Sequence, residues 1–357
     1  MLISSLLFIT CATPKTGNRQ SLDSLSARDL HAYGRSFLDS NQYLHLVSTA
    51  VHTGFSFNGE NCAINVALPA KGTHNYLQYE LDGVYQKRIR VNGDSTIVIN
   101  ATGNGMHNLW LYKATEANTG DIIIKNISGT GIRAIQQPGL PLIEFIGNSI
   151  TCGAAADPSE VPCLQGSYHD QHNAYYAYGP RVARALKTEF MVSSVSGIGI
   201  YRTWNKEEPG MDEVYEATSL ARNSTRRWNF KLFPPKIISI ALGTNDLSNG
   251  DGTTRAVFDS TTFVTRYVQF IAKLKSLHPD ARLALLNSPM LNGSRREQLQ
   301  NCLTTIKREV DSLFPSAKPV ALFFFQPMQA RGCTGHPSVE DHAILAEQLI
   351  PFFQKLL

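Results

Sequence analysis

Four segments of the chain carry the residue types that nucleophilic attack on an ester requires. In chain order these segments contain Ser149, Gly197, Asn245 and His336. A serine hydroxyl can attack a carbonyl carbon when a histidine takes its proton, and N–H donors can stabilise the resulting oxyanion. Each residue alone has a structural explanation, such as a helix cap for the serine or a turn for the glycine. The four in combination favour an acyl-transfer site.

The elements around these residues would bring them to one place. Apolar runs typical of fully buried strands occur at 142–147, 190–195, 236–243, 282–287 and 320–325. Candidate helices lie at 174–187, 259–277, 296–313 and 338–356, the last capped by Ser338 with Asp341. This alternation indicates a parallel sheet covered by helices on both faces. Such sheets place their sites at the carboxyl ends of the strands, where the four residues fall.

The segment before residue 138 has a different pattern. Short alternating apolar runs are separated by Asn and Gly turns, as in CAINVAL (62–68) and HNLWLYK (107–113). Period-two alternation of this kind predicts an antiparallel β-sandwich without helices. We therefore predict a β-sandwich over residues 26–138 and an α/β domain over 139–357, after a leader over 1–25.

The second domain resembles the SGNH, or GDSL-like, hydrolase superfamily. The segments GNSIT, SVSGIG, GTND and GHP match its four blocks. The resemblance implies a three-layer α/β/α fold with a five-stranded parallel sheet. It also implies Ser149 as nucleophile and first oxyanion donor, Gly197 (or Gly199, two residues on) and Asn245 as further oxyanion donors, and His336 as base.

The first domain narrows the resemblance to carbohydrate esterase family two. The segments that carry it are HNLWLYKATEANTG (107–120), FIGNSITCG and GIGIYRTW (197–204). That family pairs a jelly-roll domain with an SGNH domain and deacetylates xylan and related plant polysaccharides. The resemblance implies a serine O-acetylesterase that acts on acetylated polysaccharides, such as xylan or glucomannan, through an acetyl-enzyme and without a cofactor. It resembles the acetyl xylan esterases in particular.

Two other functions stay open from the sequence. The chain could be an SGNH esterase for another acyl substrate, although it has no long apolar lid segment of the kind that favours lipids. It could also be a carbohydrate-binding protein that has lost activity. The feature that permits this second possibility is the absence of an aspartate near the histidine.

That aspartate usually stands three residues before the histidine in the superfamily, and here the position is Cys333. Position 334, where family-two sequences often carry Asp, is Thr334. We therefore expect a Ser–His dyad in which a backbone carbonyl or a water holds the Nδ1 proton of His336. Asp246 is the alternative group for orienting the ring.

The wall of the predicted site also departs from the family pattern. Gly335 stands where family-two relatives often have a bulky aromatic residue beside the histidine. Tyr201, Trp204 and Tyr168 could replace it as a stacking surface for a pyranose ring. Each of the three could instead be a partly buried core aromatic.

Composition and charge suggest no further partner. The chain has 357 residues, 43% hydrophobic and 17% charged, with a net charge of +4. Because no basic run is interleaved with aromatic residues, we expect no nucleic-acid binding. His169 and His172 flank Asp170, but the sequence offers no second pair of ligands at suitable spacing. We therefore expect a solvated loop there and no metal site.

The first residues and the cysteines bear on the cell compartment. Met1–Cys11 resembles the end of a bacterial export signal, with Cys11 as a candidate lipidated residue. We therefore expect a periplasmic, extracellular or lipid-anchored protein, with membrane attachment only through an N-terminal lipid. Cys152 could pair with Cys163, and Cys302 with Cys333, in an oxidising compartment. The alternative is that these cysteines are buried thiols.

Overall fold

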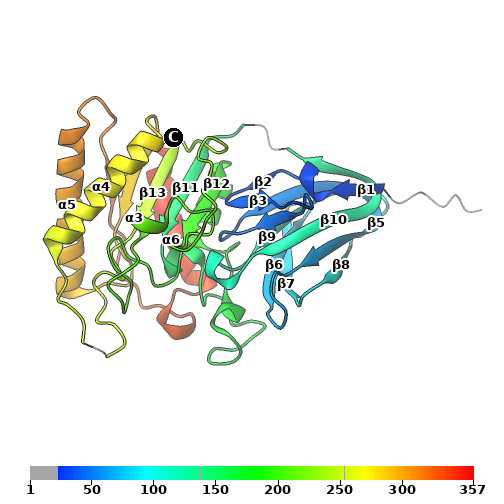
Figure 1. Cartoon of the computed structure of the whole chain (residues 1–357), viewed down its shortest axis with the longest axis horizontal. Helices are drawn as coiled ribbons and strands as arrows, with labels where there is room; N and C mark the ends of the chain where they lie inside the picture. Colours follow the sequence, from blue (N-terminus) through cyan, green and yellow to red (C-terminus); the bar gives the residue numbers. More distant parts are fainter. Residues whose placement is uncertain (1–22, 137–138, 253) are drawn as a thin grey trace, which may run out of the picture.

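The structure is a computed structural model that describes residues 23–136, 139–252 and 254–357. Two bodies lie side by side: antiparallel strands on the right of Figure 1, and a parallel sheet with its helices on the left. The expected export signal, with Cys11, lies outside the described residues. Within the described ranges, no helix has the length and apolarity needed to cross a membrane.

Ten antiparallel strands form the first body. They are β1 (Asp23–Ser26), β2 (Ala32–Tyr33), β3 (Ser36–Leu38), β4 (Leu44–Leu46), β5 (His52–Ala67), β6 (Asn75–Leu81), β7 (Val84–Val91), β8 (Ser95–Asn100), β9 (Met106–Lys113) and β10 (Ile122–Ile135). Strand β5 pairs with β2, β8, β9 and β10. Alternate side chains such as Phe55, Phe57 and Leu109 point into one buried core. The predicted all-β domain is confirmed, with only the short 3-10 turns η1 (Ala27–Asp29) and η2 (Ala117–Thr119) between its strands.

Five parallel strands form the sheet of the second body. They are β11 (Leu142–Gly147), β12 (Glu189–Ser194), β13 (Ile237–Ala241), β14 (Arg282–Leu286) and β15 (Ala321–Phe323). Their spatial order is β12-β11-β13-β14-β15, so the chain changes direction across the sheet at β11. The predicted five-stranded parallel sheet is therefore confirmed. Open sheets of this order bind ligands at the carboxyl ends of the strands, where the order reverses.

Helices cover both faces of this sheet. They are α1 (Ser149–Cys152), α2 (Tyr178–Leu186), α3 (Met211–Val214), α4 (Ser260–Leu277), α5 (Gly293–Leu313) and α6 (Val339–Gln354). On β11, Phe145 packs in one core with α2 and α6, whereas its neighbour Ile146 packs in another with α4 and α5. Successive residues of a strand point to opposite faces, so this division gives the three-layer arrangement that the sequence predicts.

The observed helix bounds differ from the expected ones in explicable ways. Helix α2 begins at Tyr178 rather than near residue 174, which places Pro180 in its first turn, where proline costs no hydrogen bond. Ser338 caps α6 by accepting the N–H of Asp341, whose carboxylate accepts the N–H of Ser338 in return. This capping box confirms the predicted start of the last helix.

The register of β11, β12 and β13 places the carboxyl ends of the three strands next to one another at the same edge of the sheet. Gly147 pairs with Ser194 on one side and with Ala241 on the other. The segments that follow these three residues therefore leave the sheet next to one another. They carry Ser149, Gly197 and Asn245.

Candidate active site

The turn after β11 presents Ser149 at the sheet edge. A Cβ on Gly147 would clash with the Thr151 side chain, so the chain turns here only with glycine. Asn148 is the N-cap of α1, and its side-chain oxygen accepts the N–H of Ile150 at 3.1 Å. Ser149 then occupies the first helical position, with only 8% of its surface exposed.

His336 lies opposite this serine. Its Nε2 is 2.9 Å from Ser149 Oγ, and its Nδ1 is 3.2 Å from the Thr334 carbonyl oxygen and 3.2 Å from Thr334 Oγ1. A proton on Nδ1 donated to the carbonyl leaves Nε2 free to accept the serine proton. The expected Ser–His pair is thus in contact, and a backbone carbonyl occupies the position expected of the orienting group.

The Thr334 carbonyl belongs to a residue with an unusual backbone conformation. Thr334 has φ +51° and ψ +33°, a left-handed conformation that β-branched residues rarely adopt. Such a residue costs about 1–3 kcal/mol and persists only where its surroundings enforce it. Next to it, Cys333 donates its N–H to the Ala155 carbonyl at 2.8 Å and is bonded to Cys163.

The disulfide Cys163–Cys333 corrects both expected pairings. Cys152 is fully buried, with its Sγ 3.0 Å from Ser194 Oγ beneath the sheet edge, so it cannot reach the loop of Cys163. Cys302 belongs to α5 and is buried in the core that α4 and α5 form with the sheet. Cys62, Cys152 and Cys302 are buried thiols, as the alternative interpretation held. The observed bond ties the loop after the nucleophile to the turn that carries the histidine.

The environment of His336 favours the neutral imidazole over the charged one. Burial lowers its pKa below the ordinary histidine value, and the nearby His172 ring contributes in the same direction. A neutral imidazole is the form that can accept the Ser149 proton. The hydrogen bonds to the Thr334 and Cys333 backbone oppose this shift.

Asp246 does not orient the histidine, which corrects the alternative assignment. Its buried carboxylate accepts the N–H groups of Ile200 and Tyr201 at 3.0–3.1 Å. It therefore fixes the loop after β12. Burial raises the pKa of Asp246 to about 6, and these hydrogen bonds act against that rise.

Three potential N–H donors belong to residues that line the same cavity as the Ser149 hydroxyl. Among the described residues, the N–H groups of Ser149 and Gly197 have no hydrogen-bond partner. The Asn245 amide donates one hydrogen to the Ile198 carbonyl at 2.8 Å, which fixes its plane and leaves the second hydrogen available. Gly199 is excluded, because its N–H donates to the Arg202 carbonyl at 2.8 Å. These are the donors that an oxyanion hole requires.

Gly197 must be glycine at this turn. Its φ is +79°, and a Cβ would lie 2.7 Å from the Trp204 ring. The Trp204 N–H also donates to the Gly197 carbonyl at 2.7 Å. Glycine is therefore required because the Trp204 ring packs directly against this turn, in which the Gly197 N–H has no partner among the described residues.

Two functional candidates were missed by the sequence reasoning, Glu116 and His172. Glu116, just before η2 of the sandwich domain, is 1% exposed. Its carboxylate accepts the Ser196 N–H at 2.6 Å and lies 3.1 Å from His172 Nε2. Because His172 is fully buried, the expectation of a solvated loop was wrong for this residue. Only the fold joins residues 116, 172 and 196, so the sequence carries no local signal for the cluster.

The site opens into a cavity of about 530 Å³. Its lining includes the proposed catalytic groups together with two aromatic walls, Tyr168 and Trp204, which are 42% and 40% exposed. The Tyr168 hydroxyl is 3.4 Å from His336 Nε2. Tyr201, the third expected stacking residue, is instead in the core: it is 9% exposed and packs near Phe258 and Phe263. The Asp246 bond to its backbone turns it inward.

Two family models match the chain. Residues 32–138 match the model described as carbohydrate esterase 2 N-terminal, and residues 145–319 match the GDSL-like lipase/acylhydrolase family. The second range contains Ser149, Gly197 and Asn245.

Known relatives and structures share both domains. The chain is 29% identical over 319 residues to the cellulase/esterase CelE of Acetivibrio thermocellus, covering 82% of this chain but only 37% of that protein. It is 26% identical over 344 residues to an acetylxylan esterase/glucomannan deacetylase of Cellvibrio japonicus, covering 93% and 92%. A solved family two carbohydrate esterase from Clostridium thermocellum, in complex with cellohexaose, has a TM-score of 0.81 at 25% identity, covering 91% of this chain and 98% of that one.

Proposed function

Because the chain belongs to the GDSL-like lipase/acylhydrolases and carries the N-terminal domain of carbohydrate esterase family two, we propose that it is a serine esterase that removes O-acetyl groups from plant polysaccharides. The single observation that carries the proposal is the 2.9 Å contact between Ser149 Oγ and His336 Nε2, in a cavity whose lining residues also supply three N–H donors. An intact dyad favours hydrolysis over carbohydrate binding alone.

The first half of the reaction forms an acetyl-enzyme. Ser149 Oγ attacks the acetyl carbonyl carbon while its proton moves to His336 Nε2. The Ser149 N–H, the Gly197 N–H and the Asn245 amide stabilise the oxyanion. As the tetrahedral intermediate collapses, the C–O bond to the sugar breaks, and the sugar oxygen takes the proton from His336.

The second half releases acetate. A water attacks the acetyl carbon and gives its proton to His336, the same donors hold the new oxyanion, and Ser149 Oγ leaves and regains its proton. Throughout both halves, the Thr334 carbonyl accepts the Nδ1 proton. A carbonyl offers no negative charge to the imidazolium, and the buried Glu116 carboxylate supplies one nearby.

The cavity supports a sugar ester as substrate. Tyr168 and Trp204 offer aromatic faces on which a pyranose ring can stack, and polar side chains such as Ser248 share the lining. A Cβ on Gly335 would meet no atom within 4 Å, so the wall beside His336 is open. The acetylxylan esterase/glucomannan deacetylase of Cellvibrio japonicus makes acetylated xylan and glucomannan the substrates to test first.

The test is acetate release from acetylated xylan, acetylated glucomannan and a simple aryl acetate. We expect release by the natural sequence and none above background by Ser149→Ala. Ser276→Ala is the matched control, because it removes an exposed serine hydroxyl on α4 outside this cavity, and it should keep the activity of the natural sequence. Release from the aryl acetate alone would contradict the polysaccharide assignment, and no release from any substrate would contradict the esterase assignment.

We also propose that the protein is exported and that a lipid at Cys11 attaches it to the membrane. The support is the apolar Met1–Cys11 segment and the disulfide between Cys163 and Cys333, a bond that forms in oxidising compartments. Fractionation of the producing cells tests both parts. The natural sequence should sediment with membranes and Cys11→Ser should not, whereas recovery in the cytoplasm would contradict export.

A further inference from the structure

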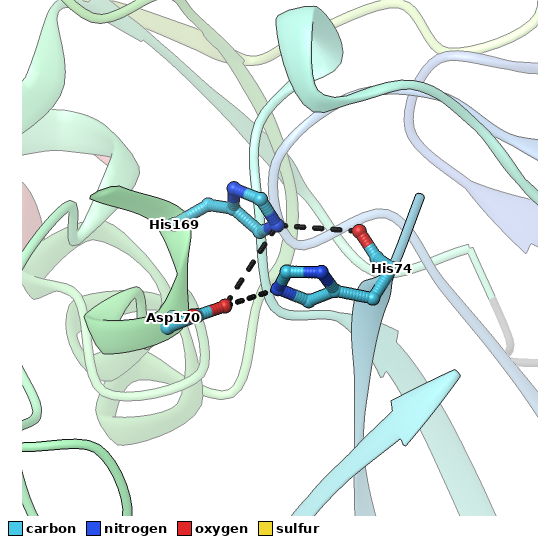
Figure 2. Close-up of side chains that lie close together, drawn as sticks. All are labelled: His74, His169 and Asp170. Carbon is cyan, nitrogen blue, oxygen red and sulfur yellow. Dashed lines mark hydrogen bonds and ion pairs between the residues drawn. The ribbon is translucent and has the colours of Figure 1, made fainter. Parts of the chain in front are cut away.

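Three metal-ligating side chains converge between the two domains. His74 lies just before β6 of the sandwich, and His169 and Asp170 lie in the 3-10 helix η3 (Tyr168–Gln171) of the second domain. One ligand atom from each residue lies within 4.8 Å of the other two. Figure 2 shows a ring nitrogen of His74 and a ring nitrogen of His169 both directed toward the Asp170 carboxylate. The group lies outside the cavity that holds Ser149 and His336.

The convergence is visible only in the fold. The sequence shows His169 and Asp170 side by side but places His74 95 residues upstream, so the expectation of no metal site was based on an incomplete ligand set. In the structure His74 Nε2 contacts Asp170 Oδ1, and His169 Nε2 is 3.9 Å from the same oxygen. His169 Nε2 also lies 3.2 Å from the His74 carbonyl.

The surroundings hold these groups in place. Asp170 Oδ2 accepts the Ser167 N–H at 2.8 Å, and the Arg88 guanidinium donates to the Asp170 carbonyl at 2.7 Å. The positive charge of Arg88 is offset by Glu160, 3.6 Å away. Metal ligands in proteins are commonly oriented by such outer hydrogen bonds.

The exposure of the three side chains suits a metal with one open position. Asp170 has 6% of its side chain exposed, whereas His74 and His169 have 15% and 20%. The carboxylate is thus anchored, while the imidazoles border solvent from which an ion and a water can enter.

We propose that His74, His169 and Asp170 bind one Zn²⁺, with water as the fourth ligand. Two imidazole nitrogens and one carboxylate oxygen form a ligand set typical of zinc, and imidazole favours zinc over magnesium or calcium. In the metal-free chain both Nε2 atoms face oxygen acceptors, so zinc takes the place of the Nε2 proton when it binds, and each ring then carries its proton on Nδ1. The ion joins the start of β6 to η3, and η3 also carries Tyr168, whose hydroxyl lies 3.4 Å from His336 Nε2. Zinc therefore fixes one wall of the cavity.

Calorimetric titration of the chelator-treated full chain with Zn²⁺ tests the site. We expect saturable binding of one ion. His74→Gln should weaken binding by more than the about 10- to 100-fold typical of losing an outer hydrogen bond to a ligand. The glutamine amide keeps a donor toward Asp170 but is a poor zinc ligand. His169→Ala should have the same effect, and circular dichroism should show that both variants fold.

The matched control is His107→Gln. His107 forms a 2.7 Å pair with Asp82 on the sandwich, without a second imidazole. Zinc binding should be unchanged in this variant, and zinc should raise the melting temperature of the natural sequence and of His107→Gln but not of His74→Gln. Absence of saturable binding would overturn the proposal. Binding that survives in both His74→Gln and His169→Ala would also overturn it, because the ion would then occupy another site.

Discussion

The carboxylate of Glu116 accepts a hydrogen bond from the N–H of Ser196 at 2.6 Å. Glu116 belongs to the sandwich domain, and Ser196 directly precedes Gly197, which lines the cavity of Ser149 and is a proposed oxyanion donor. The first domain therefore positions part of the proposed oxyanion hole of the second. The same carboxylate lies 3.1 Å from His172 Nε2.

We predict that Glu116→Gln lowers kcat by about tenfold or more, with a smaller change in KM. The glutamine can still accept the Ser196 N–H, but it lacks the negative charge that strengthens this hydrogen bond. That charge also stabilises the positive charge that forms on His336 during the reaction. Steady-state kinetics with an aryl acetate measures the effect. Glu80→Gln is the matched control, because Glu80 accepts the Tyr175 hydroxyl between the same two domains at 2.8 Å but lies away from the cavity. Equal losses in the two variants would show that Glu116 is only an interface residue.

Asn245→Ala should lower kcat by about 100- to 1000-fold, the usual cost of losing one oxyanion donor. The lost bond to the Ile198 carbonyl should cost only about 1 kcal/mol of stability, so the variant remains folded. Kinetics and a thermal melt on the same preparation separate the two effects. An unchanged kcat would remove Asn245 from the oxyanion hole.

The acid limb of kcat/KM should have its midpoint below 6.5, the ordinary pKa of histidine. Burial, followed by the nearby His172 ring, lowers the pKa of His336. His336 accepts the Ser149 proton only when neutral, so activity is present above this pKa and is lost as pH falls through it. A pH profile with an aryl acetate checks the prediction. A midpoint at or above 6.5 would contradict it.

Asp246→Ala should reduce stability much more than it reduces turnover of the remaining folded enzyme. The substitution leaves the buried N–H groups of Ile200 and Tyr201 unpaired, and we expect a loss of about 2–5 kcal/mol. Asp259→Ala, which removes the N-cap of α4, should cost about 1 kcal/mol and serves as the control. Denaturant unfolding and active-site-normalised kinetics measure the two quantities. A collapse of turnover without loss of stability would restore Asp246 as the group that orients His336.

The sequence was sufficient to predict the parallel sheet and the residues at its edge. Ser149, Gly197 and Asn245 follow three apolar strands directly, so local pattern and strand order together define their meeting place. Because Cys333 and Thr334 cannot provide a carboxylate, the sequence predicted a backbone carbonyl or a water behind His336, and the structure has the Thr334 carbonyl there.

The interactions that the sequence could not reveal join residues far apart in the chain. Glu116 meets Ser196 across 80 positions, and Cys163 bonds to Cys333 across 170. These contacts depend on how two domains and two long loops pack, which neither hydrophobic periodicity nor motif spacing encodes. Tyr201 shows that closeness to a motif can also mislead. Its position near the SVSGIG motif suggested that its side chain lines the cavity, but the bond from its N–H to Asp246 turns the side chain into the core.

The acetyl-enzyme is the most direct test of the central claim that Ser149 and His336 hydrolyse esters through a covalent intermediate. The natural protein is mixed with an aryl acetate, quenched in acid within the first turnovers and analysed by peptide mass spectrometry. We predict one acetyl group on the peptide that contains Ser149, and none on that peptide in Ser149→Ala. Rapid hydrolysis without acetylation of Ser149, or undiminished hydrolysis by Ser149→Ala, would contradict the account.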